Sequence, residues 1–425
     1  MALTMEGYRP RLMDAHISGM MKAFGAVCVE GPKWCGKTWT SLSHADSAFD
    51  VGDKSGGFQN RMLASMDPDV ALRGAEPRLI DEWQEAPAIW DAVRAEVDSS
   101  AAKGRFILSG SSTPRAKGVM HSGAGRIGSV RMRTMSLFES GDSGGQASLR
   151  DIFGRGLSMT DCGETGLERL AHLAVRGGWP GSIGLGGDLC GLVPRDYLEK
   201  AARDAARLDG RERDSEKMRM LIRSLARNES TLAGKEALKR DMMGSDGERI
   251  SDNTLSEYLD CLGRMFLTDD QPSFSPNSRS SVRVGKSGKR HLADPSLAVA
   301  ALEMGAEGLV RDLKTFGFIF EAMCARDLRI YAEASGGRLS HYRDGNGNEI
   351  DAVVEMRDGS WGAFEAKLGA DGVDEAAENL LRIAKLLERN GARPPSALCV
   401  VCGAARYAYR RPDGVHVAPL TSLRD

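Results

Sequence analysis

The sequence predicts an α/β protein whose N-terminal part contains a parallel β-sheet. Three apolar segments of strand length, at residues 26–29, 78–80 and 105–108, each end in a polar or glycine-containing turn. Helical stretches at 60–73 and 90–97 lie between these segments. Strands that alternate with helices are typical of a parallel sheet that is covered on both faces.

The composition is that of an ordinary globular chain. Of its 425 residues, 41% are hydrophobic and 27% are charged, enough for two or three domains with real cores. The net charge of −2 excludes a uniformly basic coat for nucleic acid but allows a local basic patch. Neither a membrane-spanning run nor the core of a signal peptide is present, and the 8 cysteines are too scattered for a disulfide scaffold. We therefore expect a soluble, cytoplasmic, multidomain protein.

The later parts of the chain differ from the first third in composition and in the spacing of their apolar residues. Glycine-rich loops bracket short helices in 136–191, and apolar residues recur at helical spacing through 197–264. A polar stretch at 271–291 then carries Lys and Arg but neither Asp nor Glu. Helices followed by a short basic hairpin predict a winged-helix segment. The remaining elements are expected to be a helix at 318–331, three strands, a long helix at 373–390 and a strand at 397–402.

The turn after the first strand has the pattern of a phosphate-binding loop. Gly31, Gly36, Lys37 and Thr38 have the spacing of a P-loop, between a predicted strand and a predicted helix. Backbone N–H groups of such a loop curl around phosphates, helped by the positive end of the helix. Lys37 would neutralise the β- and γ-phosphates, and the Thr38 hydroxyl would hold Mg²⁺. The residues expected to bind the nucleotide are Gly31, Pro32, Lys33, Trp34, Cys35, Gly36, Lys37, Thr38, Asp81 and Ser109.

An acidic pair follows the second of these strands. Asp81 and Glu82 come directly after an apolar segment, as the second half of a nucleotide site requires. Asp81 would hold Mg²⁺ through its water shell, and Glu82 would orient or deprotonate the attacking water. Ser109 and Ser111, at the end of the next strand, are positioned to sense the γ-phosphate. These residues predict a site that binds a nucleoside triphosphate with Mg²⁺ and hydrolyses it.

An arginine finger would complete such a site. The candidates are Arg115, Arg126, Arg131 and Arg133. We choose Arg126, within 121–127, although an ordinary solvated charge is the alternative interpretation of each arginine. A neighbouring copy of the chain would supply the arginine, so a homo-oligomer is expected.

The sequence resembles the bacterial and archaeal AAA-type ATPases that carry a C-terminal domain of unknown function with a restriction-nuclease-like core. The segments that carry the resemblance run in the family's order: EGPKWCGKT at 30–38, LIDEWQEAP at 79–87, FILSGS at 106–111, HSGAGRI at 121–127, RGGWP at 176–180 and HLADPSL at 291–297. The resemblance implies a P-loop AAA+ ATPase domain at 1–205, a helical winged-helix-like domain at 206–295 and a nuclease-like α/β domain at 296–425.

A second site is predicted in the tail, where the order of elements resembles the PD-(D/E)xK nuclease core. Asp351 is followed by Glu365 and Lys367, although Ile350 replaces the proline of the motif. Alternation along the strand at 361–368 puts Glu365 and Lys367 on the same face.

Two carboxylates make a hard-oxygen site for Mg²⁺ or Mn²⁺. Asp351 and Glu365 would be the metal ligands, Lys367 would orient or activate the water, and Glu321 on the preceding helix would contribute further. The alternative is a salt-bridged cluster that only stabilises the sheet.

These sites predict ATP binding and hydrolysis coupled to nucleic-acid contact, and to cleavage by the tail. The basic segment at 279–291 would contact DNA phosphates, with a solvated hairpin as the alternative. The alternative function is an ATP-binding regulatory switch whose non-catalytic tail docks DNA or protein.

Overall fold

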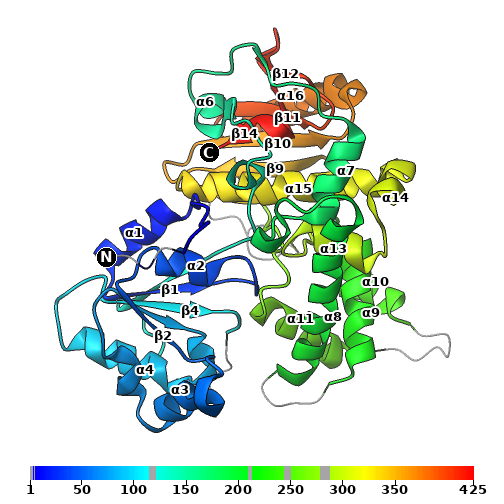
Figure 1. Ribbon diagram of the computed structural model, residues 1–425. Coiled ribbons are helices and arrows are strands. Elements are labelled where there is room, and N and C mark those ends of the chain that lie inside the picture. The colour runs from blue at the N-terminus through cyan, green and yellow to red at the C-terminus, as the bar shows by residue number, and fades with distance from the viewer. Residues whose placement is uncertain (1–2, 4, 114–120, 209–212, 244–249, 278–287) are drawn as a thin grey trace. The chain divides into compact units, whose positions relative to one another are not determined.

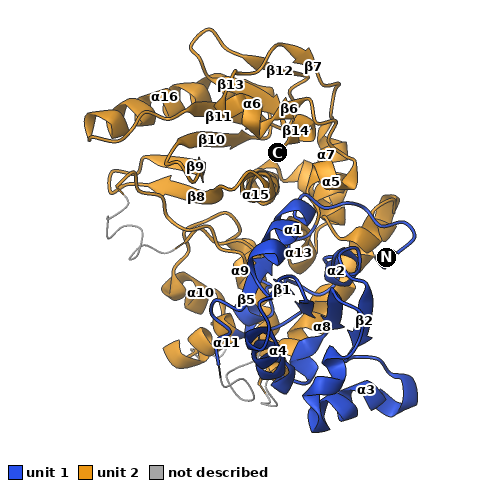
Figure 2. Ribbon diagram, turned by 90° about the vertical axis from the view of Figure 1, so that its left-hand side faces the viewer, with its two compact units in different colours: residues 1–134, 261–267 blue, residues 135–260, 268–425 orange. Residues whose placement is uncertain are grey.

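The computed structural model describes residues 3, 5–113, 121–208, 213–243, 250–277 and 288–425 (Figure 1). The chain forms two compact units, coloured separately in Figure 2. Unit 1 comprises residues 1–134 and 261–267, and unit 2 comprises 135–260 and 268–425. The predicted α/β fold class is confirmed, and the predicted domain boundaries at 205 and 295 stay a prediction.

Unit 1 is built on a five-stranded sheet in the order β2-β3-β4-β1-β5. All of its strand pairs are parallel. The strands are β1 (Ala26–Glu30), β2 (Ser47–Asp50), β3 (Arg78–Asp81), β4 (Phe106–Gly110) and β5 (Ile127–Arg131). The helices are α1 (Asp14–Ala23), α2 (Lys37–Leu42), α3 (Ser55–Met66) and α4 (Ala88–Asp98), with short 3₁₀ turns η1 (Pro68–Leu72) and η2 (Trp83–Glu85).

Alternating side chains of β1 pack on opposite faces of this sheet. Ala26 and Cys28 join a cluster with residues of α4 such as Val93. Val27 and Val29 join another cluster, which contains residues of α1. Because both faces are covered, the strand is apolar from Ala26 to Val29, as expected for the centre of a parallel sheet.

Unit 2 contains most of the helices. They are α5 (Leu137–Ser140), α6 (Leu149–Phe153), α7 (Leu167–Arg176), α8 (Leu192–Arg207), α9 (Ser215–Arg227), α10 (Lys235–Asp241), α13 (Pro295–Ala301), α14 (Ala306–Arg311), α15 (Leu313–Ala334) and α16 (Val373–Arg389). Helix α11 (Asp252–Arg264) continues into the residues that are counted with unit 1. None of the helices in the described residues has the length and apolar character of a membrane span.

The winged-helix segment stays a prediction. Helices α9, α10 and α11 are followed by two segments that pair through antiparallel bridges, Thr268 with Leu292 and Gln271 with Lys289. Arg279, Arg283 and Lys286, on which the predicted basic hairpin also rests, lie outside the described residues.

Unit 2 also holds a seven-stranded mixed sheet in the order β7-β12-β13-β11-β10-β9-β8. Its strands are β7 (Thr160–Asp161), β8 (Arg338–Arg343), β9 (Glu349–Glu355), β10 (Trp361–Lys367), β11 (Ala397–Cys402), β12 (Tyr407–Arg410) and β13 (His416–Pro419). A second, two-stranded sheet pairs β6 (Ala147–Ser148) with β14 (Leu423–Arg424). Strands from the beginning of unit 2 therefore complete the sheets formed by its end.

Helices α15 and α16 cover opposite faces of the larger sheet (Figure 1). Val400 and Cys402 of β11 pack in one cluster with α16, whereas Val401 lies beside Cys324 and Leu328 of α15. The order of helix, three strands, helix and strand from α15 to β11 is the order predicted from the sequence.

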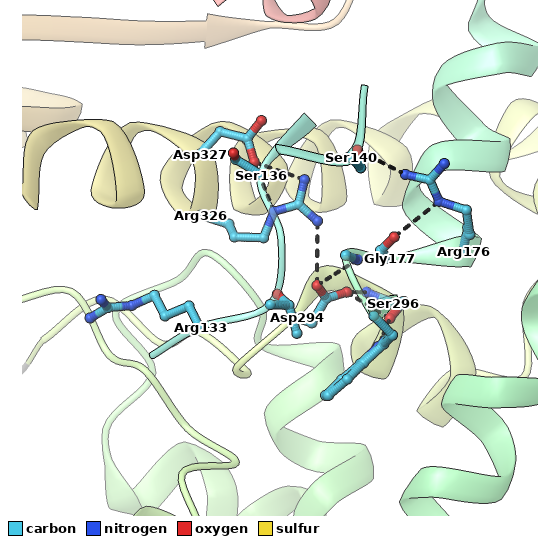
Figure 3. Close-up of polar contacts among 12 residues, drawn as sticks. Arg133, Ser136, Ser140, Arg176, Gly177, Asp294, Ser296, Arg326 and Asp327 are labelled. Atoms are coloured by element: carbon cyan, nitrogen blue, oxygen red, sulfur yellow. Dashed lines mark hydrogen bonds and ion pairs between the residues drawn. The ribbon is translucent and has the colours of Figure 1, made fainter. Parts of the chain in front are cut away.

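A buried network of charged side chains lies between α13 and α15 (Figure 3). Asp294 caps α13 by accepting from the backbone N–H of Ser296 at 3.0 Å, and it also accepts from the N–H of Gly178 at 3.0 Å. Arg326 of α15 donates to Asp294 at 3.3 Å and to Asp327 at 2.8 Å. Asp294 and Asp327 are 0% exposed, so the guanidinium compensates two carboxylates that have no access to water.

Candidate nucleotide-binding site and carboxylate cluster

The predicted phosphate-binding loop lies between β1 and α2. Gly36, which precedes α2, has φ of 105°, a conformation that glycine adopts without steric cost. At Gly31 a Cβ atom would come within 2.2 Å of the carbonyl oxygen of Met132. The two glycines of the motif are therefore required by the backbone path that forms the cradle.

Lys37 and Thr38 begin helix α2 at the mouth of this loop. The ammonium of Lys37 is buried and donates to the carbonyl of Pro32 at 2.9 Å. The hydroxyl of Thr38 donates to Oδ2 of Asp81 at 2.9 Å, which joins α2 to the end of β3. Ser109 lies beside Asp81, because the two residues are paired in the register of β3 and β4.

The oxygens of Thr38 and Asp81 fit a magnesium ion. Asp81 is 8% exposed, and its Oδ1 makes no hydrogen bond to any residue that the structure describes. Burial, together with the negative charges of Glu82 and Asp50, raises the pKa of Asp81. A hydroxyl beside a carboxylate oxygen that accepts no hydrogen bond from the described residues is a hard-oxygen donor set of the kind that Mg²⁺ prefers.

Glu82 follows Asp81 in a left-handed conformation, with φ of 52°. Its carboxylate accepts from the hydroxyl of Ser111 at 3.1 Å and from the side-chain amide of Gln84. The neighbouring Trp83 is buried and lies against Trp90, with 4.9 Å between the ring centroids. The strained backbone and these contacts fix the position of a carboxylate at the carboxyl edge of the sheet. Sequence analysis did not identify Gln84.

Arg11 is a second residue that sequence analysis did not identify. Its side chain is buried, and Nη1 donates to the carbonyl of Cys35 in the phosphate-binding loop at 2.9 Å. Nη2 donates to the carbonyls of Arg133 at 2.9 Å and Thr134 at 3.2 Å. Arg11 therefore connects the loop to the segment after β5. No local pattern marks this arginine, since its partners are distant backbone carbonyls.

Arg126 lies at the opposite edge of the sheet from the phosphate-binding loop, because it precedes β5 while the loop follows the parallel strand β1. Its Nε donates to Asp98 at 2.7 Å. That Arg126 acts as an arginine finger stays a prediction, in which it would complete the nucleotide site of a neighbouring copy of the chain. Arg131, at the other end of β5, is in register with Glu30, and its guanidinium lies 5.4 Å from the ring centroid of Phe266. Arg115 lies outside the described residues.

The carboxylates of the predicted second site come together in unit 2. Glu321 of α15, Asp351 of β9 and Glu365 of β10 line one small cavity of about 10 Å³. Oδ2 of Asp351 accepts from the backbone N–H of Ala366 at 3.0 Å. Nζ of Lys367 lies 3.9 Å from Oε2 of Glu365.

Lys289 also enters this carboxylate cluster, which we define as Glu321, Glu349, Asp351 and Glu365. Its Nζ lies 2.6 Å from Glu321, 3.0 Å from Glu349 and 3.4 Å from Asp351, and its side chain is 1% exposed.

This position corrects the assignment of Lys289 to a basic DNA-contacting face. The lysine is covered by carboxylates, so it has no surface to offer a phosphate. Its neighbour Arg290 pairs with Asp270 at 2.5 Å.

The carboxylate cluster places four acidic side chains around one ammonium. Burial and the charge of Asp351 raise the pKa of Glu321 to about 8, and the same two causes raise the pKa of Glu365 well above its usual range. Burial alone would lower the pKa of Lys289, but Asp351, Glu321 and Glu349 outweigh it and raise that pKa. The group of charges therefore keeps Lys289 protonated.

The carboxylate cluster does not fit a divalent metal in this arrangement. Within the described residues, no group of three or more His, Cys, Asp or Glu side chains is arranged to hold a metal ion. An ammonium lies among the oxygens that would be the ligands, and a divalent cation in the same place would repel it.

A parallel sheet with a phosphate-binding loop after β1 and an acidic pair at the end of β3 defines unit 1 as a P-loop fold. Residues 23–140 match a family described as an AAA domain. Residues 167–308 and 316–423 match two domains of unknown function, DUF8612 and DUF4143. The resemblance to AAA-type ATPases with a C-terminal domain of unknown function is thereby confirmed, while the nuclease-like core of that domain stays a prediction.

Among solved structures, the chain is similar to the Walker-type ATPase PABY2304 of Pyrococcus abyssi. The two share 12% sequence identity with a TM-score of 0.44, over 71% of this chain and 98% of that one. An identity this low carries no function from one protein to the other. A comparison with curated protein sequences finds no match.

Proposed function

We propose that unit 1 binds ATP with Mg²⁺ in the phosphate-binding loop and hydrolyses it. The observation that carries this proposal is the 2.9 Å contact between Thr38 and Asp81, beside the buried ammonium of Lys37. Lys37 would exchange its bond to Pro32 for the β- and γ-phosphate oxygens. Bound Mg²⁺ would neutralise charge that develops on those phosphates. Thr38 and Asp81 would hold the ion from the helix and from the strand.

Hydrolysis requires a group that orients or deprotonates water at the γ-phosphate. Glu82 is our candidate, because its carboxylate follows the strand that ends in Asp81. The contacts from Ser111 and Gln84 would restrict the rotamers of Glu82, so that its oxygens stay directed at one position. Ser109 would sense the γ-phosphate from the end of β4.

The Lys37→Ala variant tests the binding step. We expect calorimetry to detect ATP binding by the wild-type chain and an affinity at least about 10-fold weaker for the variant, because a charge-assisted contact is lost. Lys22→Ala on the exposed side of α1 is the matched control and should bind like wild type. A wild-type chain without affinity for ATP, or a variant that binds equally well, would contradict the proposal.

The Arg11→Ala variant tests whether the buried arginine positions the loop. We expect a KM for ATP raised roughly 10-fold with little change in kcat, because Arg11 contacts loop backbone and no reacting atom. Steady-state phosphate release at varied ATP measures both constants. Arg11→Lys retains the charge but not the planar set of donors, so it should recover only part of the loss. An unchanged KM would show that the loop holds its shape without this residue.

For the C-terminal domain we propose docking without cleavage, so that the chain acts as an ATP-controlled switch. The observation that favours this function is the ammonium of Lys289 within the carboxylate cluster. Contact with nucleic acid and assembly into a homo-oligomer are parts of the same proposal. Supercoiled plasmid incubated with the protein, ATP and Mn²⁺ is expected to remain uncut. A nick that Asp351→Asn abolishes would support cleavage instead.

A further inference from the structure

We propose that Lys289 is the built-in cation of the carboxylate cluster and occupies the place of a divalent ion. The cluster would then be a latent metal site, which takes up Mn²⁺ or Mg²⁺ only when the lysine is removed. This inference is independent of ATP binding, because all of the residues involved belong to unit 2.

Backbone hydrogen bonds hold Lys289 in place beside the carboxylate cluster. Its N–H donates to the carbonyl of Gln271 at 2.9 Å, and the N–H of Gln271 donates back at 2.8 Å. The side-chain amide of Gln271 donates to the carbonyls of Ser340 at 2.7 Å and Asp351 at 3.0 Å. The pair of segments that carries Lys289 is thereby attached to β8 and β9, directly beside the carboxylates.

The surroundings of the ammonium match its chemistry. A lysine ammonium has three N–H donors, and three carboxylates lie within 3.4 Å of Nζ, from Glu321, Glu349 and Asp351. With a side chain only 1% exposed, Lys289 has no water to replace these partners. A lysine in this position is stable only because the carboxylates compensate its charge.

The same contacts occupy the oxygens that a metal would need. Oδ1 of Asp351 faces Lys289, and Oδ2 accepts from the N–H of Ala366 at 3.0 Å. Oε1 of Glu321 faces Lys289, and Oε1 of Glu365 accepts from Asn379 at 3.2 Å. The adjoining cavity of about 10 Å³ is at the lower limit for one water molecule, so it cannot hold a hydrated dication beside the ammonium.

Removing the ammonium should convert the cluster into a cation site. The oxygens released from Lys289 belong to Glu321 of α15 and to Glu349 and Asp351 of β9. Glu365 of β10 lines the same cavity as Glu321 and Asp351, and hard dications favour several such oxygens. Without the ammonium, these buried groups must bind either protons or a metal ion, so the Lys289→Met variant should be destabilised until a metal binds.

The experiment measures Mn²⁺ binding and thermal unfolding of the nucleotide-free full chain. We expect Lys289→Met to gain one saturable Mn²⁺ site, detected by calorimetry, that the wild type lacks. We also expect its melting temperature to fall by about 10 °C and to recover with Mn²⁺. Any Mn²⁺ at the phosphate-binding loop is common to every variant, since Thr38 and Asp81 are unchanged.

The matched control is Lys367→Met, which removes the same charge beside the same cluster. Nζ of Lys367 is 3.9 Å from Glu365 and the side chain is 36% exposed, so its loss should add no Mn²⁺ site. Adding Asp351→Asn to Lys289→Met should abolish the new site.

Two results would overturn the proposal. One is a Mn²⁺ site in the wild-type chain that Asp351→Asn removes. The other is a lack of Mn²⁺ uptake by Lys289→Met, either in the native chain or after refolding with Mn²⁺, and also by the less charged combination of Lys289→Met with Glu321→Gln. The wild-type titration decides the first point even where no variant folds.

Discussion

The Glu82→Gln variant is expected to lose ATP turnover by a factor of roughly 10² to 10⁴ and to retain ATP affinity close to that of wild type. Glutamine keeps the shape of the side chain and the capacity to accept from Ser111. It cannot accept a proton from the attacking water, so only the chemical step is affected. Phosphate release in a single turnover and calorimetry with ATP measure the two effects separately.

The matched control for this prediction is Glu85→Gln. Glu85 lies in the same 3₁₀ turn region, but its side chain is 43% exposed and pairs with Arg61 at 3.3 Å. We expect turnover within about 2-fold of wild type for this control, because surface charge changes of this kind have small effects. A Glu82→Gln variant that hydrolyses as fast as Glu85→Gln would remove Glu82 from the reaction and leave the unit a binding module.

Replacing Asp294 by alanine is expected to cost unit 2 about 3–5 kcal/mol of unfolding free energy, because the buried Arg326 loses one of its two carboxylate partners and keeps only Asp327. The cap of α13 and the contact to Gly178 are lost as well. Scanning calorimetry should show the transition of unit 2 moving down by about 10 °C, with little change in unit 1.

Asp312→Ala provides the comparison for that prediction. Asp312 also caps a helix, since it accepts from the backbone N–H of Thr315 at 3.1 Å, but it is exposed, and no guanidinium of the described residues pairs with it. Loss of Asp312 should lower the unfolding temperature of unit 2 much less than loss of Asp294 does. Equal effects of the two substitutions would mean that the buried ion pairs contribute nothing beyond the cap.

The sequence predicted the interior strands of unit 1 and missed the strands at its edges. β1, β3 and β4 are buried on both faces, so each appears as an apolar run. β2 and β5 are the outer strands and include polar or glycine residues, such as Ser47 and Gly128, because one side of each strand has no neighbour. The predicted helix at 60–73 ends at Met66, before Pro68 begins a 3₁₀ turn.

The two sites differ in whether their residues can be recognised from neighbouring positions in the sequence. The phosphate-binding loop is encoded in consecutive residues, so its spacing could be recognised directly. The roles of Arg11 and Lys289 depend on partners that lie far away in the chain. Lys289 belongs to a stretch without acidic residues, which indicated an exposed basic hairpin, and only the fold brings Glu321 and Asp351 to it.

The sharing of strands across unit 2 has a practical consequence for module exchange. Strand β7 pairs with β12, β6 pairs with β14, and Lys289 reaches the sheet from outside the 316–423 region. A fragment that begins at residue 296 would lack β7, so the backbone edge of β12 would be exposed and would favour aggregation. It would also lack Lys289, so the carboxylate cluster would have lost its ammonium. The C-terminal domain therefore cannot be transferred alone to another protein. A transferred domain would have to include residues 147–161 and 288–292.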